Sequence, residues 1–347
     1  MTSAAVPGAL MRAEIAEQPD RWVDLALSER GSIDAAAAII RATDPELLVF
    51  AARGSSDHAA QYGQYLAHNL LRIPAMLSTP STFTAFGTRL RFPRSVMLAI
   101  SQSGSSPDLL ATVRATKAAG VPVIAFTNDP ESPLAALGDV HIALSAGPEL
   151  SVAATKTYTA ELLALYAVLS RAAGASRDDT FESLFGIASA ATEVMTQGAP
   201  VVATWREQLA DSARVLVVGR GYSMSTAKEG ALKLMETNSI AASGWSAADA
   251  KHGPLGQVVA GTPVLFLTAS PGGRESVESF VHDVVGLGGR PIVLDSSFPG
   301  MSRPGLDPAL IPLLEILPLQ QLALELAVGR GLDPDRPAGL RKVTQTS

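Results

Sequence analysis

The chain has 347 residues, of which 47% are hydrophobic and 17% charged, and its formal net charge is −6 at pH 7. This length is sufficient for two domains with large buried cores. The mild acidity, without a basic cluster, argues against nucleic acid as a partner. The absence of cysteine excludes disulfides, thiolate catalysis and cysteine-ligated zinc.

The N-terminus has no basic start followed by an apolar core, so it does not resemble a secretory signal. No apolar run reaches the roughly 18 residues of a membrane span without a charge, proline or glycine. The nearest is residues 258–273, which Gly261 and Pro263 interrupt. We therefore expect a cytoplasmic protein without a membrane partner.

The first half of the chain alternates between helical and extended patterns. Residues 9–42 have helical character, and the apolar segment 46–52 then ends in Arg-Gly-Ser-Ser. Helical spacing at 57–71 and 108–120 separates further apolar segments, which lie at 95–100, 121–129 and 140–146. This alternation predicts parallel strands joined by helical crossovers.

The pattern begins again near residue 213. The segment ARVLVVGRGYS at 213–223 repeats an apolar strand followed by Arg-Gly-x-Ser, and the strands at 262–270 and 290–296 follow in the same order. We therefore predict an α/β fold with two similar domains, each a parallel sheet flanked by helices. The predicted parts are an N-terminal helical segment 1–43, a first domain 44–172, a helical linker 173–199, a second domain 200–335 and a tail 336–347.

Small polar residues crowd the end of the strand 95–100, in the sequence SQSGSS at 101–106. Ligands of open α/β sheets bind beyond the carboxyl ends of the strands, where a helix N-terminus presents free N–H groups to an anion. Gly104 lets the backbone approach closely. The loop therefore favours phosphate binding, and helix capping in a polar loop is the alternative. Neither a Walker loop nor a dinucleotide fingerprint is present, so no nucleotide cofactor is expected.

Three charged residues, Glu229, Lys233 and Glu236, share one face of a predicted helix. By spacing alone, a solvated ion-pair stripe is the more ordinary interpretation. His252 follows in the broken sequence DAKHGPLG, where it either serves function or stabilises a turn. No His, Asp or Glu cluster has metal-ligand spacing, so we expect no metal and no other cofactor.

Six motifs in order resemble the sugar isomerase (SIS) domain family, over roughly residues 30–347. The likeness is to the isomerase part of glutamine:fructose-6-phosphate amidotransferase and to glucosamine-6-phosphate deaminases of the SIS type. The motifs are GSS, SQSG, VAATKTYT, EGALKLME, KHGPLG and the terminal LRKVT.

The resemblance implies two groups of residues at one site. Substrate binding is implied for Ser55, Ser56, Ser101, Gln102, Ser103, Ser106, Val152 and Ala154. Catalytic roles are implied for four residues. Glu236 moves a proton between C1 and C2 of the sugar, and Lys233 assists Glu236. His252 opens the sugar ring, and Lys342 stands near the carbonyl end of the sugar, with which it can form an imine. The resemblance also implies a homodimer in which His252 reaches the partner subunit's site.

Some positions depart from the family pattern. Ser106 stands where threonine is usual and keeps the hydroxyl, whereas Ala154 replaces a serine and Met235 replaces a lysine beside Glu236. The glutaminase domain of the amidotransferase, with its N-terminal cysteine, has no counterpart here. We therefore expect an amino-sugar phosphate deaminase/isomerase that converts glucosamine-6-phosphate to fructose-6-phosphate and ammonia. The alternatives are a deglycase of fructosamine-type phosphates, another SIS-fold sugar isomerase, or a sugar-phosphate sensor without turnover.

Overall fold

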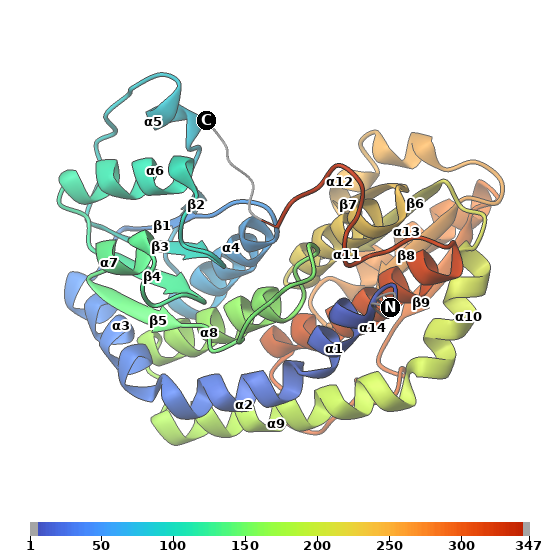
Figure 1. Ribbon diagram of the computed structural model, residues 1–347, viewed down its shortest axis with the longest axis horizontal. Coiled ribbons are helices and arrows are strands. Elements are labelled where there is room, and N and C mark those ends of the chain that lie inside the picture. Colours follow the sequence, from blue (N-terminus) through green and yellow to red (C-terminus); the bar gives the residue numbers. More distant parts are fainter. Residues whose placement is uncertain (1–5, 343–347) are drawn as a thin grey trace, which may run out of the picture. The chain divides into compact units, whose positions relative to one another are not determined.

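The computed structural model describes residues 6–342, which form two compact units (Figure 1). The first-sheet unit comprises residues 20–148 and 156–185. The second-sheet unit comprises residues 6–19, 149–155 and 186–342.

The first-sheet unit is built on a parallel sheet with the strand order β2-β1-β3-β4-β5. Its central strands are continuous apolar runs because helices cover both faces of the sheet. Leu98 of β3 is paired with Phe50 of β1 and Ile124 of β4, and all three are buried. The strands are β1 (Leu47–Ala51), β2 (Ala75–Leu77), β3 (Ser95–Ser101), β4 (Val123–Thr127) and β5 (Val140–Ala143).

Helices α6 and α7 lie on one side of this sheet, and α3, α4 and α8 lie on the other (Figure 1). Pro107 begins α6, where a missing N–H costs nothing, and Gly120 follows its end with a positive φ. The helices are α2 (Gln18–Ser28), whose first two residues belong to the second-sheet unit, α3 (Arg30–Thr43), α4 (Ser55–Leu66), η1 (Ala67–Leu71), α5 (Ser81–Thr84), α6 (Pro107–Ala118), α7 (Pro133–Leu137) and α8 (Lys156–Ala172).

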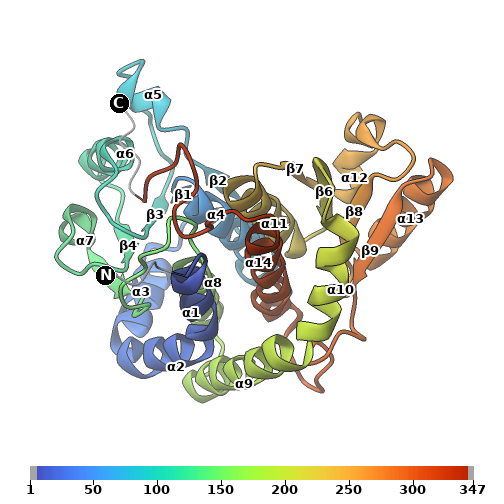
Figure 2. The ribbon, with the colours of Figure 1, turned by 45° about the vertical axis from the view of Figure 1, so that its right-hand side comes forward.

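The second-sheet unit repeats this design on a parallel sheet with the order β7-β6-β8-β9. Helices α10, α11 and α14 lie on one side of the sheet, and α12 and α13 lie on the other (Figure 2). The strands are β6 (Arg214–Gly219), β7 (Ala241–Ser246), β8 (Pro263–Leu267) and β9 (Arg290–Leu294). The helices are α1 (Ala9–Ala16), α10 (Ala199–Leu209), α11 (Ser223–Asn238), α12 (Ala247–Ala250), η2 (Pro254–Gln257), α13 (Arg274–Gly286), η3 (Pro308–Leu310) and α14 (Ile311–Gly329), and α9 (Arg177–Gln197) has residues in both units. The predicted α/β fold with two parallel sheets is confirmed.

Strand β7 was not predicted, because its sequence AASGWS lacks an apolar run. Small residues are needed there because α11 lies directly against the strand. A Cβ atom on Gly244 would lie only 2.4 Å from the Cα of Lys228. The edge strand therefore has small side chains where the helix approaches its backbone closely.

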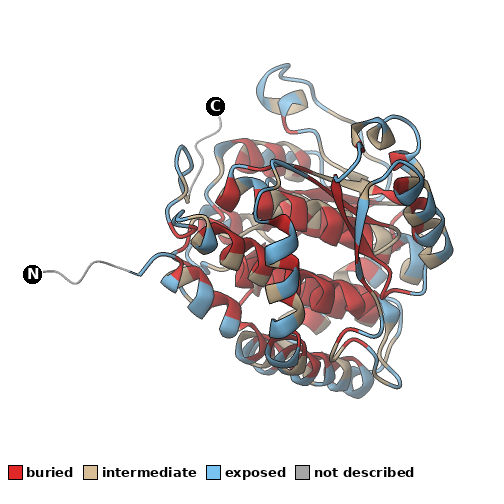
Figure 3. Ribbon diagram, turned by 90° about the vertical axis from the view of Figure 1, so that its right-hand side faces the viewer, coloured by how far each residue is buried: buried red, intermediate tan, exposed pale blue. Residues whose placement is uncertain are grey.

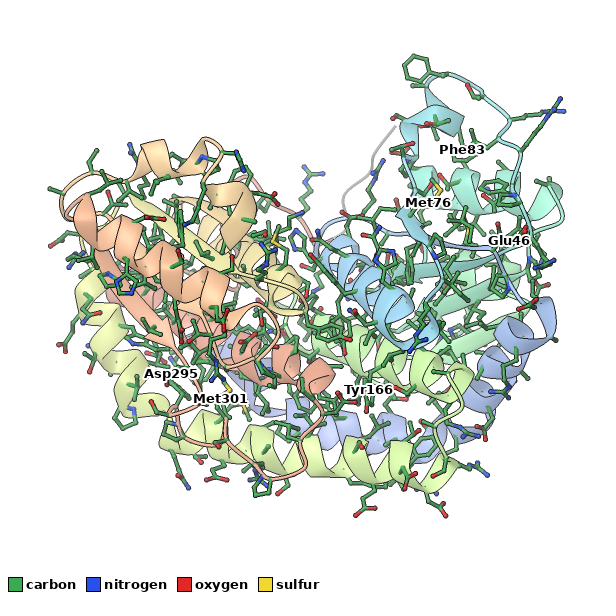
Figure 4. All side chains as sticks on the ribbon, turned by 180° about the vertical axis from the view of Figure 1, so that it is seen from behind. Glu46, Met76, Phe83, Tyr166, Asp295 and Met301 are labelled. Atoms are coloured by element: carbon green, nitrogen blue, oxygen red, sulfur yellow. The ribbon has the colours of Figure 1, made fainter. Side chains whose placement is uncertain are left out.

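The core of the second-sheet unit contains α14, whose residues are almost all buried (Figure 3). The stretch Pro308–Gly329 is long and apolar enough to cross a membrane, but 83% of its most apolar window is buried inside the protein. That burial is typical of a core helix. Residues 258–273, the longest apolar run noted in the sequence, contain the buried strand β8 instead of a helix. The segment that joins β9 to α14 carries Asp295 and Met301 (Figure 4), and Met301 is buried.

Candidate active site

The loop SQSGSS connects the end of β3 to the start of α6. It turns sharply at Gly104, which has φ +60° and whose Cβ would lie 2.3 Å from the Oγ of Ser132. Only glycine fits both the conformation and the space. The backbone N–H of Gly104 donates to the Ser101 hydroxyl at 3.1 Å, so the loop is folded by its own polar groups.

The N-terminus of α6 is open toward this loop. Ser106 occupies the cap position with an extended backbone, but its side chain makes no capping hydrogen bond. The alternative explanation of the loop, capping by hydroxyls, therefore does not account for Ser106. The side chains of Ser101, Gln102, Ser103 and Ser106 are all half-buried. The loop thus combines hydroxyls and an amide with the N-terminal turn of a helix, a combination suited to a phosphate.

The N-terminus of α4 lies at the same edge of the sheet, because β1 and β3 are parallel neighbours. Ser55 is half-buried, and the buried Ser56 donates its hydroxyl hydrogen bond to Glu161 of α8 at 2.7 Å. Arg53, at the end of β1, pairs with Asp108 of α6 at 3.2 Å. This ion pair ties the Ser55–Ser56 turn to the helix that follows SQSGSS.

Helix α11 carries a buried ion triad. The Nζ of Lys233 lies 3.2 Å from Glu229 and 2.5 Å from Glu236, and the side chains of Lys233 and Glu229 are completely buried. Packing of α11 against α14 and β7 buries this face. The interpretation as a solvated stripe, favoured by spacing alone, is therefore wrong. The spacing defines one helix face, but the sequence does not show that α14 covers it.

The electrostatics of the triad keep Lys233 charged. Burial disfavours an ammonium ion, but the two neighbouring carboxylates outweigh that effect and raise the pKa of Lys233 above its ordinary value. Lys233 is thus a fixed cation rather than a base at neutral pH. Its ammonium pairs with one carboxylate oxygen of Glu236.

Glu236 is the exposed end of the triad, with 21% of its side chain accessible. Its Oε2 contacts the ammonium of Lys233. Within residues 6–342, its Oε1 takes part in no hydrogen bond or ion pair. A carboxylate anchored by one oxygen, with the other available, is suited to carry a proton between two positions of a bound molecule.

Lys342 is paired with a carboxylate that sequence analysis missed. Its Nζ lies 2.7 Å from Oε2 of Glu149, whose side chain is completely buried. Glu149 opens the segment 149–155, in which Val152 and Ala154 are half-buried. The N–H of Val152 donates to the carbonyl oxygen of Asp335 at 3.2 Å, so this segment runs beside the tail. The only sequence signal for Glu149 was an acidic residue three positions before the VAATK motif.

His252 lies in the turn between α12 and η2, next to Gly253 at φ +134°. The residue is exposed, and its imidazole makes no hydrogen bond or ion pair to any part of the chain that the structure describes. The role implied for it stays a prediction.

The structure therefore groups the candidate residues into separate clusters. Ser55, Ser56 and the SQSGSS residues belong to the first-sheet unit, whereas Val152, Ala154, Lys233, Glu236, His252 and Lys342 belong to the second-sheet unit. Among the described residues, no group of His, Cys, Asp and Glu is placed to hold a metal ion.

The comparisons with known proteins agree with this fold. The SIS domain matches residues 43–171 and 208–298, one match on each sheet, and the chain belongs to the SIS domain family. It is 34% identical over 346 residues to the glutamine–fructose-6-phosphate aminotransferase of Thermococcus kodakarensis, covering 96% of this chain but 57% of that protein. The chain thus spans little more than half the length of this relative.

Two solved structures are similar along their whole length. A candidate phosphosugar isomerase from Silicibacter pomeroyi is 30% identical, with a TM-score of 0.82 over 94% of this chain and 99% of that chain. A glucosamine-6-phosphate deaminase from Thermotoga maritima is 19% identical, with a TM-score of 0.74 over 94% of this chain and 100% of that chain. The second likeness concerns the fold alone.

Proposed function

We propose that the protein is a sugar-phosphate isomerase of the SIS fold and that its reaction is the deamination of glucosamine-6-phosphate to fructose-6-phosphate and ammonia. The observation that carries the proposal is the buried ion triad, in which Lys233 holds Glu236 by one oxygen and leaves the other accessible. The phosphate-type loop SQSGSS and the names of the related proteins support the class of substrate.

The chemistry requires one proton to move between adjacent carbons. In the open-chain sugar, Glu236 removes the proton from C2, and the electrons pass to the C1 carbonyl oxygen, which is protonated to give an enolamine. Glu236 then returns a proton to C1, and C2 becomes an imine. Water adds to that imine and ammonia leaves, which yields fructose-6-phosphate. One carboxylate on one face of the substrate is sufficient for both transfers.

The other residues have supporting roles in this proposal. The Ser101–Ser106 loop holds the phosphate, and Ser55, Ser56, Val152 and Ala154 contact the sugar. Lys233 keeps Glu236 oriented, and the ammonium of Lys342 stabilises negative charge at the carbonyl end. Its amine can also add to the C2 carbonyl of the ketose with loss of water, which forms an imine. His252 protonates the ring oxygen, from the partner subunit of a cytoplasmic homodimer.

The test is to incubate the purified protein with glucosamine-6-phosphate and to measure ammonia and fructose-6-phosphate together. We expect them in equal amounts, and we expect the Glu236→Gln variant to produce neither. N-acetylglucosamine-6-phosphate, fructosamine-6-phosphate and glucose-6-phosphate complete the substrate panel. Release of an amine from fructosamine-6-phosphate alone would establish the deglycase instead. Binding of these sugars without turnover of any would establish a sensor.

A further inference from the structure

The N-terminal helix α1 buries a carboxylate that the proposed chemistry does not use. Glu14 is only 4% exposed, between buried apolar neighbours such as Met11 and Ile15. Its Oε1 accepts the backbone N–H groups of Leu150 and Ser151, the latter at 3.2 Å. Glu14 therefore fastens helix α1 to the segment 149–155.

That segment carries the partner of the tail lysine. Glu149 directly precedes the two residues that Glu14 holds. Its Oε1 accepts the N–H of Thr155 at 2.9 Å, and its Oε2 accepts from Lys342 at 2.7 Å. A continuous chain of contacts thus runs from Glu14 through Leu150 and Glu149 to the ammonium of Lys342.

The tail is tied to the same helix from the other side. Asp335 is buried, and its carboxylate accepts the N–H groups of Leu10 and Met11 at 3.0 and 2.8 Å, in the first turn of α1. Its carbonyl oxygen accepts from Val152. Helix α1, the segment 149–155 and residues 333–342 therefore form one interlocked assembly within the second-sheet unit.

A buried carboxylate has an energetic cost that an apolar residue would avoid. Burial and the nearby charge of Glu149 raise the pKa of Glu14, and the N–H groups of Leu150 and Ser151 offset this only in part. Packing of α1 does not require the charge. An apolar side chain could not make the hydrogen bonds to the segment 149–155.

We propose that Glu14 is a positioning residue for Lys342: it clamps the turn at Leu150 and Ser151 so that Glu149 places the lysine ammonium. The inference rests on the proposed function, in which Lys342 meets the carbonyl end of the sugar. It gives α1 a role in the site without assigning any of its residues a contact with the substrate.

The test compares two substitutions of similar volume. Glu14→Met keeps the length of the side chain but accepts no hydrogen bond, whereas Glu14→Gln keeps an acceptor for the two N–H groups. Arg12→Gln is the control, because Arg12 is exposed on the same helix and pairs with Glu325 of α14 instead. Thermal unfolding of each variant establishes that it is folded.

The first measurement is hydrogen exchange without substrate, over peptides that cover 148–153 and 333–342. We expect faster exchange in both peptides for Glu14→Met, and protection like that of the unmodified protein for Glu14→Gln and Arg12→Gln. Because no sugar is present, the outcome is independent of the proposed reaction. Unchanged protection of both peptides in Glu14→Met would overturn the positioning role.

The second measurement follows Lys342 in the reaction. Fructose-6-phosphate is added with borohydride, and the imine on Lys342 is trapped as a secondary amine and quantified by mass spectrometry. We expect Glu14→Met to lower trapping and kcat by about ten- to a hundredfold, with KM changed much less, because a misplaced group costs rate rather than binding. Glu14→Gln should restore both. Equal trapping in all variants would contradict the proposal, whereas an unmodified protein that never forms the imine would contradict the role of Lys342 in the proposed function.

Discussion

The hydroxyl of Ser56 lies 2.7 Å from the carboxylate of Glu161, and both side chains are buried between α4 and α8. The second-sheet unit has a buried serine and a buried glutamate in similar places. Ser223 begins α11, and the completely buried Glu315 lies on α14. The hydroxyl of Ser223 opposes the rise that burial causes in the pKa of Glu315. Each half of the duplicated fold thus has a buried serine in the first turn of the helix that follows its first strand and a buried glutamate on a core helix.

The first pair gives a prediction about substrate binding. Glu161→Met removes the acceptor that orients the Ser56 hydroxyl, and a hydrogen bond to a charged group contributes about 1.5–3 kcal/mol. We expect KM for the sugar phosphate to rise about tenfold, with kcat changed little. Glu161→Gln keeps an acceptor and should lie close to the unmodified enzyme. Initial-rate kinetics measure both, and identical KM values for Glu161→Met and the unmodified enzyme would refute the orientation argument.

The SQSGSS loop offers a matched pair of serines. Ser103 is half-buried and Ser105 is exposed, with its hydroxyl donated to the carbonyl of Ser103 at 3.1 Å. We expect Ser103→Ala to weaken binding of inorganic phosphate and of the sugar phosphate roughly tenfold, because a donor to an anion is lost. Ser105→Ala should change binding less than twofold. Titration calorimetry provides the measurement, and equal effects of the two substitutions would remove Ser103 from the phosphate site.

Glu236→Gln separates binding from chemistry. The amide cannot accept the C2 proton, so we expect kcat to fall by about 10²–10⁴-fold, the range for loss of a general base. Sugar-phosphate affinity should stay within a few fold, because the phosphate loop is intact. Kinetics and calorimetry on the same preparation test this, and turnover at the unmodified rate would exclude Glu236 as the proton carrier.

Glu315 gives a stability prediction. Burial raises its pKa from an ordinary value of 4.5 to about 7, against the opposing effect of the Ser223 hydroxyl and the backbone N–H groups of Ser270 and Ala269. The unfolded chain ionises at the lower value, so folding stability is lost as the pH rises from about 4.5 to about 7. The loss amounts to about 3 kcal/mol.

Urea unfolding at several pH values measures this effect. The stability of the unmodified protein relative to Glu315→Gln should fall as the pH rises through this window, because glutamine does not titrate. A difference between the two proteins that is the same at all pH values would show that Glu315 keeps an ordinary pKa.

The implied sharing of His252 between subunits is testable by complementation. Glu236→Gln and His252→Ala should each be nearly inactive. If His252 serves the partner's site, one site of a mixed dimer carries both native residues. When the two variants are mixed and allowed to exchange subunits, the mixture should then recover about a quarter of the activity of the unmodified enzyme. Light scattering reports whether the protein is a dimer, and a dimer without recovery would place His252 in its own subunit's site or outside both.

The sequence was most informative about the fold where buried strands are continuous apolar runs. Strands β1, β3, β4, β6 and β8 and the SQSGSS loop after β3 could be placed in this way. Strand β7 could not be placed, because its small residues allow the close approach of α11 and do not form an apolar strand pattern. The duplication was visible because Arg-Gly-x-Ser follows the first strand of both copies.

The site was harder to predict from the sequence because its geometry depends on contacts between distant segments. Helical spacing placed Lys233 with Glu229 and Glu236, but only the packing of α14 shows that the triad is buried. Glu149 and Glu161 were missed because their partners, Lys342 and Ser56, lie far away in the sequence. The sequence around a single acidic residue, in an apolar helix or before a motif, does not show which group that residue contacts in the folded protein.

The SQSGSS loop lies in the first copy of the duplicated fold and the ion triad in the second. After such a duplication, the two copies are free to diverge for different purposes. Changes that retune which sugar is held can accumulate in one copy while the acid–base machinery of the other is inherited intact. Selection for new substrates in the laboratory would accordingly begin with mutant libraries at Ser55 and Ser56, which lie in the first copy and are proposed to contact the sugar.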